Sequence, residues 1–560
     1  MLIVLARGAA GVVARRFDED GAPLGAPETV DDLAAFVRER EPGRPRWVWD
    51  DSRAWYPALL RAGVRVERCL DLRLCHAILR GSASAAGSAL QAAPPGPWDA
   101  AAEPAGSSEP AGSPGPAGPL GAPAALFDLA EGEAPPAPDP VAEWLLQRAA
   151  VAASADTARL GLLLAAESVG ALIACELSHA GLPFDLVRHD ALLTELLGPR
   201  PRGARRPERL ERLRREFERL LGVGEVNPDS PAELLRALHR AGIRTASTRS
   251  WELRRLEHPA IAPLLEYKAL ARLASANGWR WAEEWVSAGR FRPSYLPGGV
   301  VTGRWAASGG GALQLPRQLR GAVVADPGWL LVVADAAQLE PRVLAALSAD
   351  AGMAAAGRGD LYEGIVASGA VATRAQAKVA LLGAMYGATT GESGRLLPGL
   401  ERAFPRAVGL VERAARAGER GEVVTTLLGR SSPPPDAGWH EAQAAAGRDA
   451  ASEARARSQG RFTRNFVVQG TAAEWALSWM GLLRARLWEL GPGSLTAGAH
   501  LVYFLHDEVI VHTPAEHAET VLELVRDCAA EAGRLLFGGS PVRVGFPVTA
   551  VAVRSYAEAK

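Results

Sequence analysis

The stretch LVYFLHDEVIV, residues 501–511, decides the fold class of this chain. Five apolar residues run into His506, Asp507 and Glu508, and the apolar pattern then resumes. Short apolar runs of this length, bounded by polar residues, are typical of strands, so the stretch predicts strand, turn and strand. The charged residues are either a hairpin turn that faces water or an acidic site held on a rigid hairpin.

A second run, LLVVAD at residues 330–335, predicts a buried strand that ends in the carboxylate of Asp335 and passes into a helical pattern. Two carboxylates on adjacent strands suit phosphoryl transfer, because Mg²⁺ prefers oxygen ligands and is often held by one or two carboxylates plus substrate phosphates. Two such ions can stabilise both the attacking and the leaving oxygen of an in-line displacement. The sequence supplies candidate ligands for that arrangement.

The segment TRAQAKVALLGAMYG, residues 373–387, predicts a helix with a distinctive stripe. Arg374, Lys378, Leu382 and Tyr386 recur every fourth residue and therefore share one face. The two cations could bind a triphosphate and the aromatic ring could pack on a base. The alternative is a basic face that is simply solvated.

Length and charge limit the classes of protein that fit. A chain of 560 residues predicts roughly two to four domains. The formal net charge of −1 gives no global positive field, so any nucleic-acid contact must come from local basic patches. Lys378 is one of three lysines in a chain that otherwise uses arginine. The four cysteines are scattered and form no CxxC pair, which argues against a zinc ribbon or a disulfide framework.

The first residues, MLIVLARG, hold too few apolar residues for a signal sequence or a spanning helix. They predict a short β-strand instead. A cytoplasmic, nucleoid-associated protein that does not bind a membrane is expected.

Residues 1–80 predict a small α/β unit. Residues 81–140 are rich in Ala, Pro, Gly and Ser and predict a linker or disordered insertion. Residues 207–221 place leucines and Phe217 on one helical stripe, which is either packed on a core or part of a nucleic-acid-tracking helix.

Together and in this order, three segments resemble motifs A, B and C of the family A DNA polymerases: VVADAAQLEPRVLAALS (332–348), RAQAKVALLGAMYG (374–387) and LHDEVIVH (505–512). Further segments agree with the family pattern: LLEYKALARLAS (264–275), TGRW (302–305), LQLPRQLR (313–320), LLGR (427–430) and RFTRNFVVQGTAAE (461–474). The similarity covers roughly residues 165–560.

The resemblance implies an α/β multidomain fold, with a right-hand polymerase of palm, fingers and thumb behind a small RNase H-like, exonuclease-type domain. The implied domains are the exonuclease-like unit at 1–80, the linker at 81–140, a helical connection and thumb at 141–300, palm at 301–350, fingers at 351–430, a loop at 431–460 and palm again at 461–560. The Pro/Ala-rich stretch 431–459 is expected to be an elaborated surface loop.

The resemblance also implies roles for individual residues. Two Mg²⁺ ions, for which Mn²⁺ could substitute, would be held by Asp335 and Asp507, and Lys378 and Glu508 would complete the catalytic group. The residues expected to bind the incoming dNTP are Arg374, Lys378, Glu340, Gln338, Leu382, Tyr386 and His506. The residues expected to contact primer-template DNA are Arg304, Arg461, Asn465, Gln469 and Tyr386.

Several positions depart from the family pattern. Leu382 stands where the family usually has an aromatic residue, and Ala336 and Ala337 replace a common Tyr-Ser. Pro341 and Trp305 are also unusual. No metal ligand is lost, so activity is expected, with altered sugar discrimination.

The N-terminal unit lacks the acids that a family exonuclease needs. The first strand of such a domain carries Asp-x-Glu, whereas MLIVLARG has no acid. Asp50, Asp51 and Asp71 are present but are expected to be turn or surface residues. The expectation is an exonuclease-like domain that cannot cut.

The resulting hypothesis is a monomeric, template-directed DNA polymerase that acts in replication or repair. One alternative is a relative that binds primer-template DNA with weak or no catalysis. A single-subunit RNA polymerase is the other, but Glu340 and the triplet HDE speak against it.

Overall fold

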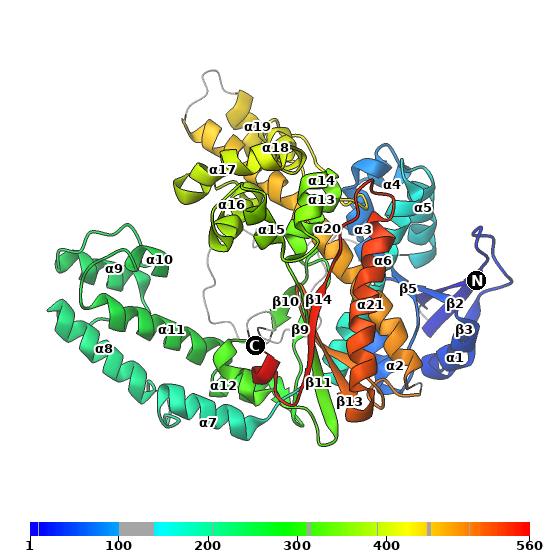
Figure 1. Cartoon of the computed structure of the whole chain (residues 1–560). Helices are drawn as coiled ribbons and strands as arrows, with labels where there is room; N and C mark the ends of the chain where they lie inside the picture. Colours follow the sequence, from blue (N-terminus) through cyan, green and yellow to red (C-terminus); the bar gives the residue numbers. More distant parts are fainter. Residues whose placement is uncertain are drawn as a thin grey trace, which may run out of the picture. The chain divides into compact units, whose positions relative to one another are not determined.

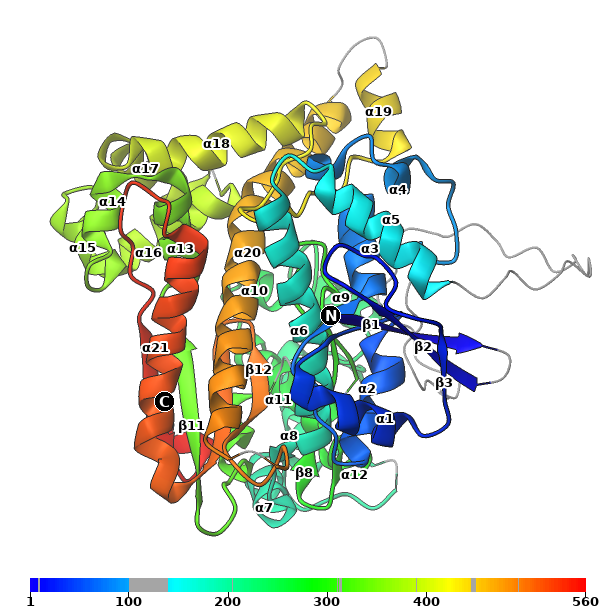
Figure 2. The same ribbon diagram turned by 90° about the vertical axis from the view of Figure 1, so that its right-hand side faces the viewer.

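The computed structural model in Figures 1 and 2 describes residues 1–8, 11–99, 139–203, 205–309, 311, 315–388, 390–444, 450–491 and 493–559. The chain divides into two compact units. The first comprises Met1–Leu172, Val379–Pro398 and Val408–Leu477, and the second comprises Ile173–Lys378, Gly399–Ala407 and Ser478–Lys560. Five helices, α6, α16, α17, α18 and α20, continue from one unit into the other.

A four-stranded antiparallel sheet of order β12-β13-β11-β14 forms the centre of the second unit. Its strands are β11 (Trp329–Ala336), β12 (His500–Leu505), β13 (Glu508–Pro514) and β14 (Val548–Val553). The predicted strand-turn-strand at 501–511 is confirmed as β12 and β13. The predicted buried strand is confirmed as β11, which pairs with β13.

Both faces of this sheet are covered, which explains why β11 is a continuous apolar run rather than an alternating one. Leu331 and Val333 on β11 join a core with Val502 and Ile510. Val332 and Ala334, which point the other way, are also buried. Helix α21 (Ala518–Phe537) packs against β11, β13 and β14 (Figure 1).

The second unit also holds a short sheet of order β6-β8-β7 and the hairpin β9-β10, and six helices lie between β6 and β7 in the chain. The small strands are β6 (Leu182–Pro183), β7 (Val286–Ser287), β8 (Arg290–Phe291), β9 (Ser294–Leu296) and β10 (Ala306–Gly309). The helices around them are α7 (Leu186–Leu197), α8 (Glu208–Leu221), α9 (Pro231–Arg240), α10 (Ser250–Leu253), α11 (Ile261–Asn277) and α12 (Trp279–Trp285).

The amphipathic helix predicted at 207–221 is confirmed as α8, and its apolar stripe is buried. Leu210 and Leu213 belong to the core beneath the sheet, while Phe217 and Leu221 join a separate core with α9 and α11. Packing therefore accounts for the apolar face.

A run of helices follows β11. They are α13 (Leu339–Ser348), α14 (Ala351–Ala356), α15 (Leu361–Ala367), α16 (Arg374–Tyr386), α17 (Gly391–Ala403) and α18 (Pro405–Glu419). Helix α16 confirms the helix predicted from TRAQAKVALLGAMYG.

A five-stranded sheet of order β3-β2-β1-β4-β5 organises the N-terminal part of the first unit. The elements are β1 (Leu2–Gly8), β2 (Gly11–Phe17), β3 (Glu28–Val30), α1 (Leu33–Arg40), β4 (Arg46–Trp49), α2 (Ser52–Arg61), β5 (Cys69–Asp71) and α3 (Leu72–Arg80). Strands β1 to β3 are antiparallel, and β4 and β5 run parallel to β1. The N-terminal part is thus a small α/β domain with a mixed sheet, and its RNase H-like character stays a prediction.

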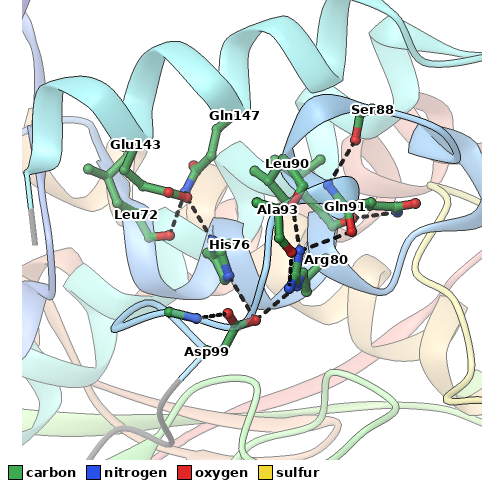
Figure 3. A network of polar contacts seen from close by, with 12 residues as sticks. Leu72, His76, Arg80, Ser88, Leu90, Gln91, Ala93, Asp99, Glu143 and Gln147 are labelled. Atoms are coloured by element: carbon green, nitrogen blue, oxygen red, sulfur yellow. Dashed lines mark hydrogen bonds and ion pairs between the residues drawn. The ribbon is translucent and has the colours of Figure 1, made fainter.

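The stretch predicted as a linker from residue 81 is folded up to residue 99. It carries a 3-10 turn at Ala83–Ala85 and helix α4 (Ala89–Ala92). Figure 3 shows the reason: Arg80 donates to the carbonyl oxygens of Leu90 and Ala93 at 2.6 and 2.8 Å and to Asp99 at 2.9 Å. Residues 100–138 of the predicted linker lie outside the described residues.

His76 lies at the centre of the same network (Figure 3). Its Nδ1 lies 2.8 Å from Glu143 on α5 (Pro140–Ala152), and its Nε2 lies 3.3 Å from Asp99. Burial works against the imidazolium, but the hydrogen bonds and charges of Glu143 and Asp99 outweigh it and raise the pKa of His76. Composition alone does not predict these contacts of His76, because Asp99 and Glu143 are far from it in the sequence.

The surface loop predicted at 431–459 is partly helical instead. Helix α19 spans Ala437–Ala444, and α20 (Ala450–Glu489) begins well before the predicted end of the loop. Alanine has the highest helix propensity, which favours helices in this alanine-rich stretch. Its prolines, residues 433–435, precede α19 and therefore do not interrupt a helix.

One helix within the described residues, α6 (Thr157–Ala180), is long and apolar enough to cross a membrane, and 78% of its most apolar window is buried inside the fold. Burial of that kind is typical of a core helix.

Candidate functional site

Three acidic residues meet at the ends of two neighbouring strands in the second unit. Asp335, near the end of β11, pairs in register with Glu508, the first residue of β13. The next amide along β11, that of Ala336, donates to the carbonyl oxygen of Asp507 at 2.8 Å. The predicted pair Asp335 and Asp507 therefore lies on adjacent segments of one sheet.

The connection between β12 and β13 is a tight turn. His506 adopts a left-handed backbone with φ of 57°, and the Asp507 amide donates to the Leu505 carbonyl oxygen at 2.6 Å. A left-handed conformation is uncommon for a residue with a side chain and often marks a functional turn. His506 is exposed, Asp507 is partly buried and Glu508 is only 2% exposed. The hairpin is thus both a turn and a rigid support for acids.

The carboxylates repel each other. Burial first, and then the charge of Asp335, raise the pKa of Asp507 to about 6. A bound cation relieves repulsion of this kind, so the donor set fits a hard divalent ion. Among the described residues no group of three or more His, Cys, Asp or Glu side chains is placed to hold a metal. The pair would therefore need further oxygen ligands from substrate and water.

Glu508 is committed to a structural contact. The hydroxyl of Tyr556 donates to its carboxylate, and the Arg320 guanidinium lies 4.2 Å from the centre of the Tyr556 ring. Burial and the Glu508 charge raise the pKa of Tyr556 above its ordinary range. This contact fixes the base of the acidic hairpin.

Gln338 and Glu340 lie at the start of α13, just after the Asp335 strand. Gln338 is left-handed, with φ of 56°. Its side-chain amide donates to Asp360 at 2.8 Å and accepts from the Leu361 amide at 2.9 Å. Glu340 forms an ion pair with Arg304. The structure thus brings a predicted DNA contact, Arg304, together with a predicted nucleotide contact, Glu340.

Arg374 and Lys378 occupy successive turns of α16. The Arg374 guanidinium donates to Asp360 at 2.8 Å and lies 5.4 Å from the centre of the Tyr362 ring. Lys378 is exposed. Asp360 was missed by the sequence analysis, although Asp360 and Glu363 have capping-box spacing at the start of α15. It connects Arg374 to Gln338.

A second group of predicted residues lies in the first unit, on α16 and α20. Gly387 at the end of α16 has φ of 74°, and a Cβ there would come within 2.8 Å of Arg461, so this close approach requires glycine. Tyr386 is 38% exposed. The side-chain oxygen of Asn465 is buried and has no hydrogen-bond partner. Such an orphaned acceptor is suited to a ligand donor.

Arg464, in the same α20 segment, was also missed. It is 5% exposed, donates to the Ala384 carbonyl oxygen of α16 at 2.9 Å and forms an ion pair with Glu412 of α18. Arg464 thus connects α16 to α20. Two of the predicted site residues, Leu382 on α16 and Gln469 on α20, are partly buried.

The departures from the family pattern have local explanations. Ala336 is buried and pairs with Val548 of β14. Pro341 lies in the first turn of α13, where a helix has no use for its missing amide. Trp305 packs on Phe504 and Tyr295, with ring centres 5.0 and 5.4 Å apart.

Asp50, Asp51 and Asp71 in the N-terminal domain each take part in a structural contact. Asp51 caps α2 and pairs with Arg53, and Asp50 accepts from the Trp55 indole. The expectation that Asp71 is a turn or surface residue is wrong, because it is 2% exposed and caps α3. It also accepts from the Ser52 amide at 2.7 Å. Burial, followed by the charge of Asp51, raises its pKa to about 7.

The sheet, the acidic hairpin and the helices together define an α/β protein with an acidic site at the ends of two strands. Comparison with known proteins shows its family. The family described as DNA polymerase family A matches residues 203–551. This chain therefore belongs to DNA polymerase family A.

Individual relatives agree with the family. DNA polymerase I, thermostable, of Thermus aquaticus is 28% identical over 361 residues, which are 57% of this chain and 41% of that protein. DNA polymerase I of Chloroflexus aurantiacus is 28% identical over 346 residues, which are 54% of this chain and 33% of that protein. The chain spans less than half the length of these curated relatives.

A solved structure shares the fold. It is the POL domain of Pol1 from M. smegmatis in complex with DNA primer-template and dNTP, with a TM-score of 0.67 and 18% identity. The match covers 100% of this chain and 95% of the other. The expected α/β polymerase fold is confirmed by this likeness.

Proposed function

We propose that this chain is a template-directed DNA polymerase that adds deoxynucleotides to the 3′ end of a primer, in DNA replication or repair. The observation that best supports the proposal is the pairing of Asp335 and Asp507 on adjacent segments of one sheet, in a member of DNA polymerase family A. The relatives named DNA polymerase I, and the primer-template and dNTP of the structural neighbour, point to the same substrates.

Asp335 and Asp507 would hold two Mg²⁺ ions, and Mn²⁺ could substitute. Ions in such a site stabilise the attacking and the leaving oxygens of nucleotidyl transfer. The raised pKa of Asp507 supports this role, since mutual repulsion of the two carboxylates favours a bound cation. Glu508, held by Tyr556, would position the hairpin, with His506 beside the primer terminus.

Arg374 and Lys378 would bind the triphosphate, the first as a fork and the second as a point charge. Lys378 would then be placed to protonate the leaving pyrophosphate. Asp360 would orient Arg374 before the nucleotide arrives, which is supported by their 2.8 Å contact.

Glu340 and Gln338 would lie against the sugar of the incoming nucleotide, and Leu382 would pack over it. Arg304 pairs with Glu340, so nucleotide and primer contacts would be coupled through this ion pair. Arg461, Asn465 and Gln469 would contact primer or template, and exposed Tyr386 would stack near the templating base.

The N-terminal domain would have the architecture of a proofreading nuclease without its activity. Strand β1 carries no acid, and Asp50, Asp51 and Asp71 are each engaged in a cap, an ion pair or an indole contact. A polymerase without proofreading is the consequence.

Primer extension tests the proposal. A labelled primer annealed to a longer template is incubated with Mg²⁺ and either dNTPs or rNTPs, using the parent protein and Asp507→Ala. Template-complementary extension with dNTPs by the parent alone is expected. Absence of extension by a folded parent that still binds the duplex would favour a non-catalytic relative, and preference for rNTPs would favour an RNA polymerase.

A further inference from the structure

A pocket of about 430 Å³ lies in the N-terminal domain, at the amino-terminal edge of its parallel strands. Arg46 begins β4, and Leu2 begins β1. Helix α5 packs against β1 (Figure 2) and β4. Residues of α5 and of the start of α6 line the other side of the pocket. Asp50 and Asp71 lie at the opposite, carboxyl-terminal ends of β4 and β5.

Three guanidinium groups line this pocket, those of Arg46, Arg68 and Arg148, against a single acid, Glu19. Arg68 donates to the Arg44 carbonyl oxygen at 2.6 Å, and Arg148 donates to the Glu19 carbonyl oxygen at 2.5 Å. Neither contact neutralises a positive charge, because both acceptors are backbone carbonyls.

Of the three guanidinium groups, that of Arg46 has the fewest polar partners among the described residues. It is partly buried, and within the described residues its guanidinium takes part in no hydrogen bond or ion pair. Burial, and next the neighbouring Arg68, lower its pKa, and the opposing effect of Glu19 is smaller than that of Arg68. Arginine is seldom withdrawn from water without a partner, because desolvation of an unpaired charge is costly.

The remaining wall of the pocket is largely apolar. Trp144 and Leu164 are buried beside it, and Val151 and Leu70 are partly buried. A volume of 430 Å³ falls within the range of small-molecule sites, which combine an apolar lining with a few polar groups that fix orientation.

We propose that this pocket binds a small organic anion, with its carboxylate or phosphate head on Arg46 and Arg68 and its flat apolar body between α5 and α6. The site is independent of Asp335 and Asp507, so it does not depend on the proposed polymerase activity.

Titration of the full chain with 1-anilinonaphthalene-8-sulfonate tests the proposal, because this dye joins an anionic head to an aromatic body and brightens in apolar surroundings. Saturable binding at one site is expected. Arg46→Gln should weaken binding about tenfold or more, since a charge-assisted hydrogen bond is lost.

A second variant tests the pocket without changing its charge. Gly161 of α6 lines the pocket, and a Cβ there would meet nothing within 4 Å. Gly161→Leu should fill the space and abolish binding while the melting temperature is maintained. Arg61→Gln and Ala158→Leu, at exposed positions outside the pocket, are the matched controls and should bind as the parent does.

Equal dye binding by the parent, Arg46→Gln and Gly161→Leu would overturn the proposal. Competition between the dye and small anions then identifies the charged group and the apolar part that the pocket prefers. Displacement of the dye by benzoate indicates a carboxylate ligand, and displacement by phenyl phosphate indicates a phosphate ligand. Inorganic phosphate that competes as well as phenyl phosphate would contradict a site with an apolar subsite.

Discussion

Arg374 and Lys378 are adjacent on α16 but differ in surroundings. Arg374 is held by Asp360, whereas Lys378 is exposed one turn further on. If the first binds phosphate and the second assists departure of pyrophosphate, their replacement should affect different constants. A substitution that removes ground-state and transition-state binding equally raises KM alone.

We therefore expect Arg374→Gln to raise the KM for dNTP about tenfold or more, and Lys378→Gln to lower kcat about tenfold or more. Steady-state incorporation of a single nucleotide gives both constants. Arg358→Gln, at an exposed position, is the control. Identical KM and kcat changes in the two variants would contradict separate roles.

His512 makes the fold sensitive to acid. It is 1% exposed and stacks on Trp329, with ring centres 4.5 Å apart. Burial, and then the neighbouring His500, lower its pKa to about 3. A histidine whose folded pKa is depressed contributes stability above its unfolded pKa near 6.5, and that contribution is lost as the pH falls toward the folded pKa.

Between pH 7 and pH 5 the free energy of unfolding should therefore fall by about 2 kcal/mol through His512. Urea unfolding at the two pH values measures it. His512→Gln should lose less stability over this range than the parent, whereas exposed His440→Gln should behave as the parent does. An unchanged pH dependence in His512→Gln would refute the assignment.

At the scale of elements, Arg464 of α20 connects that helix to α16 and α18. Its guanidinium is buried between the Ala384 carbonyl oxygen and Glu412. Its removal leaves the Ala384 carbonyl oxygen and the partly exposed Glu412 carboxylate without their donor, and an unsatisfied group costs about 1–3 kcal/mol, more when it is charged. Arg464→Met should thus destabilise the protein by about 3 kcal/mol, whereas Arg457→Met, on the exposed face of α20, should cost under about 1 kcal/mol. Thermal unfolding followed by circular dichroism compares the two variants, and equal losses would contradict the assignment.

The elements that carry the site were predictable because their signals are local. Six apolar residues before Asp335 specify β11, and the apolar runs around HDE specify β12 and β13. Contacts between distant segments were not predictable. Glu508 meets Tyr556 48 residues away, and Arg464 meets Glu412 52 residues away. No short pattern marks such a pair.

Three expectations were wrong, each for its own physical reason. Composition predicted a linker from residue 81 and a loop over 431–459, but residues 81–99 are held by Arg80 and alanines extend α19 and α20. Asp71 was expected at the surface because an acid usually is, yet two backbone amides compensate its burial.

For the whole molecule, we predict DNA synthesis without proofreading. A labelled primer incubated with Mg²⁺ and no nucleotides should keep its length, because β1 has no acid and Asp71 caps α3. The experiment is read on a denaturing gel. Shortening from the 3′ end that stops on chelation and persists in Asp507→Asn would show that the N-terminal domain cuts.

Rapid-quench incorporation of one templated dNTP tests most directly whether Asp335 and Asp507 form the polymerase site. We predict incorporation by the parent and by Asp527→Asn, an exposed control on α21. Folded Asp335→Asn and Asp507→Asn should incorporate the nucleotide at a rate lower by a factor of about 10³ or more. Incorporation by Asp507→Asn at the parent rate would contradict this assignment.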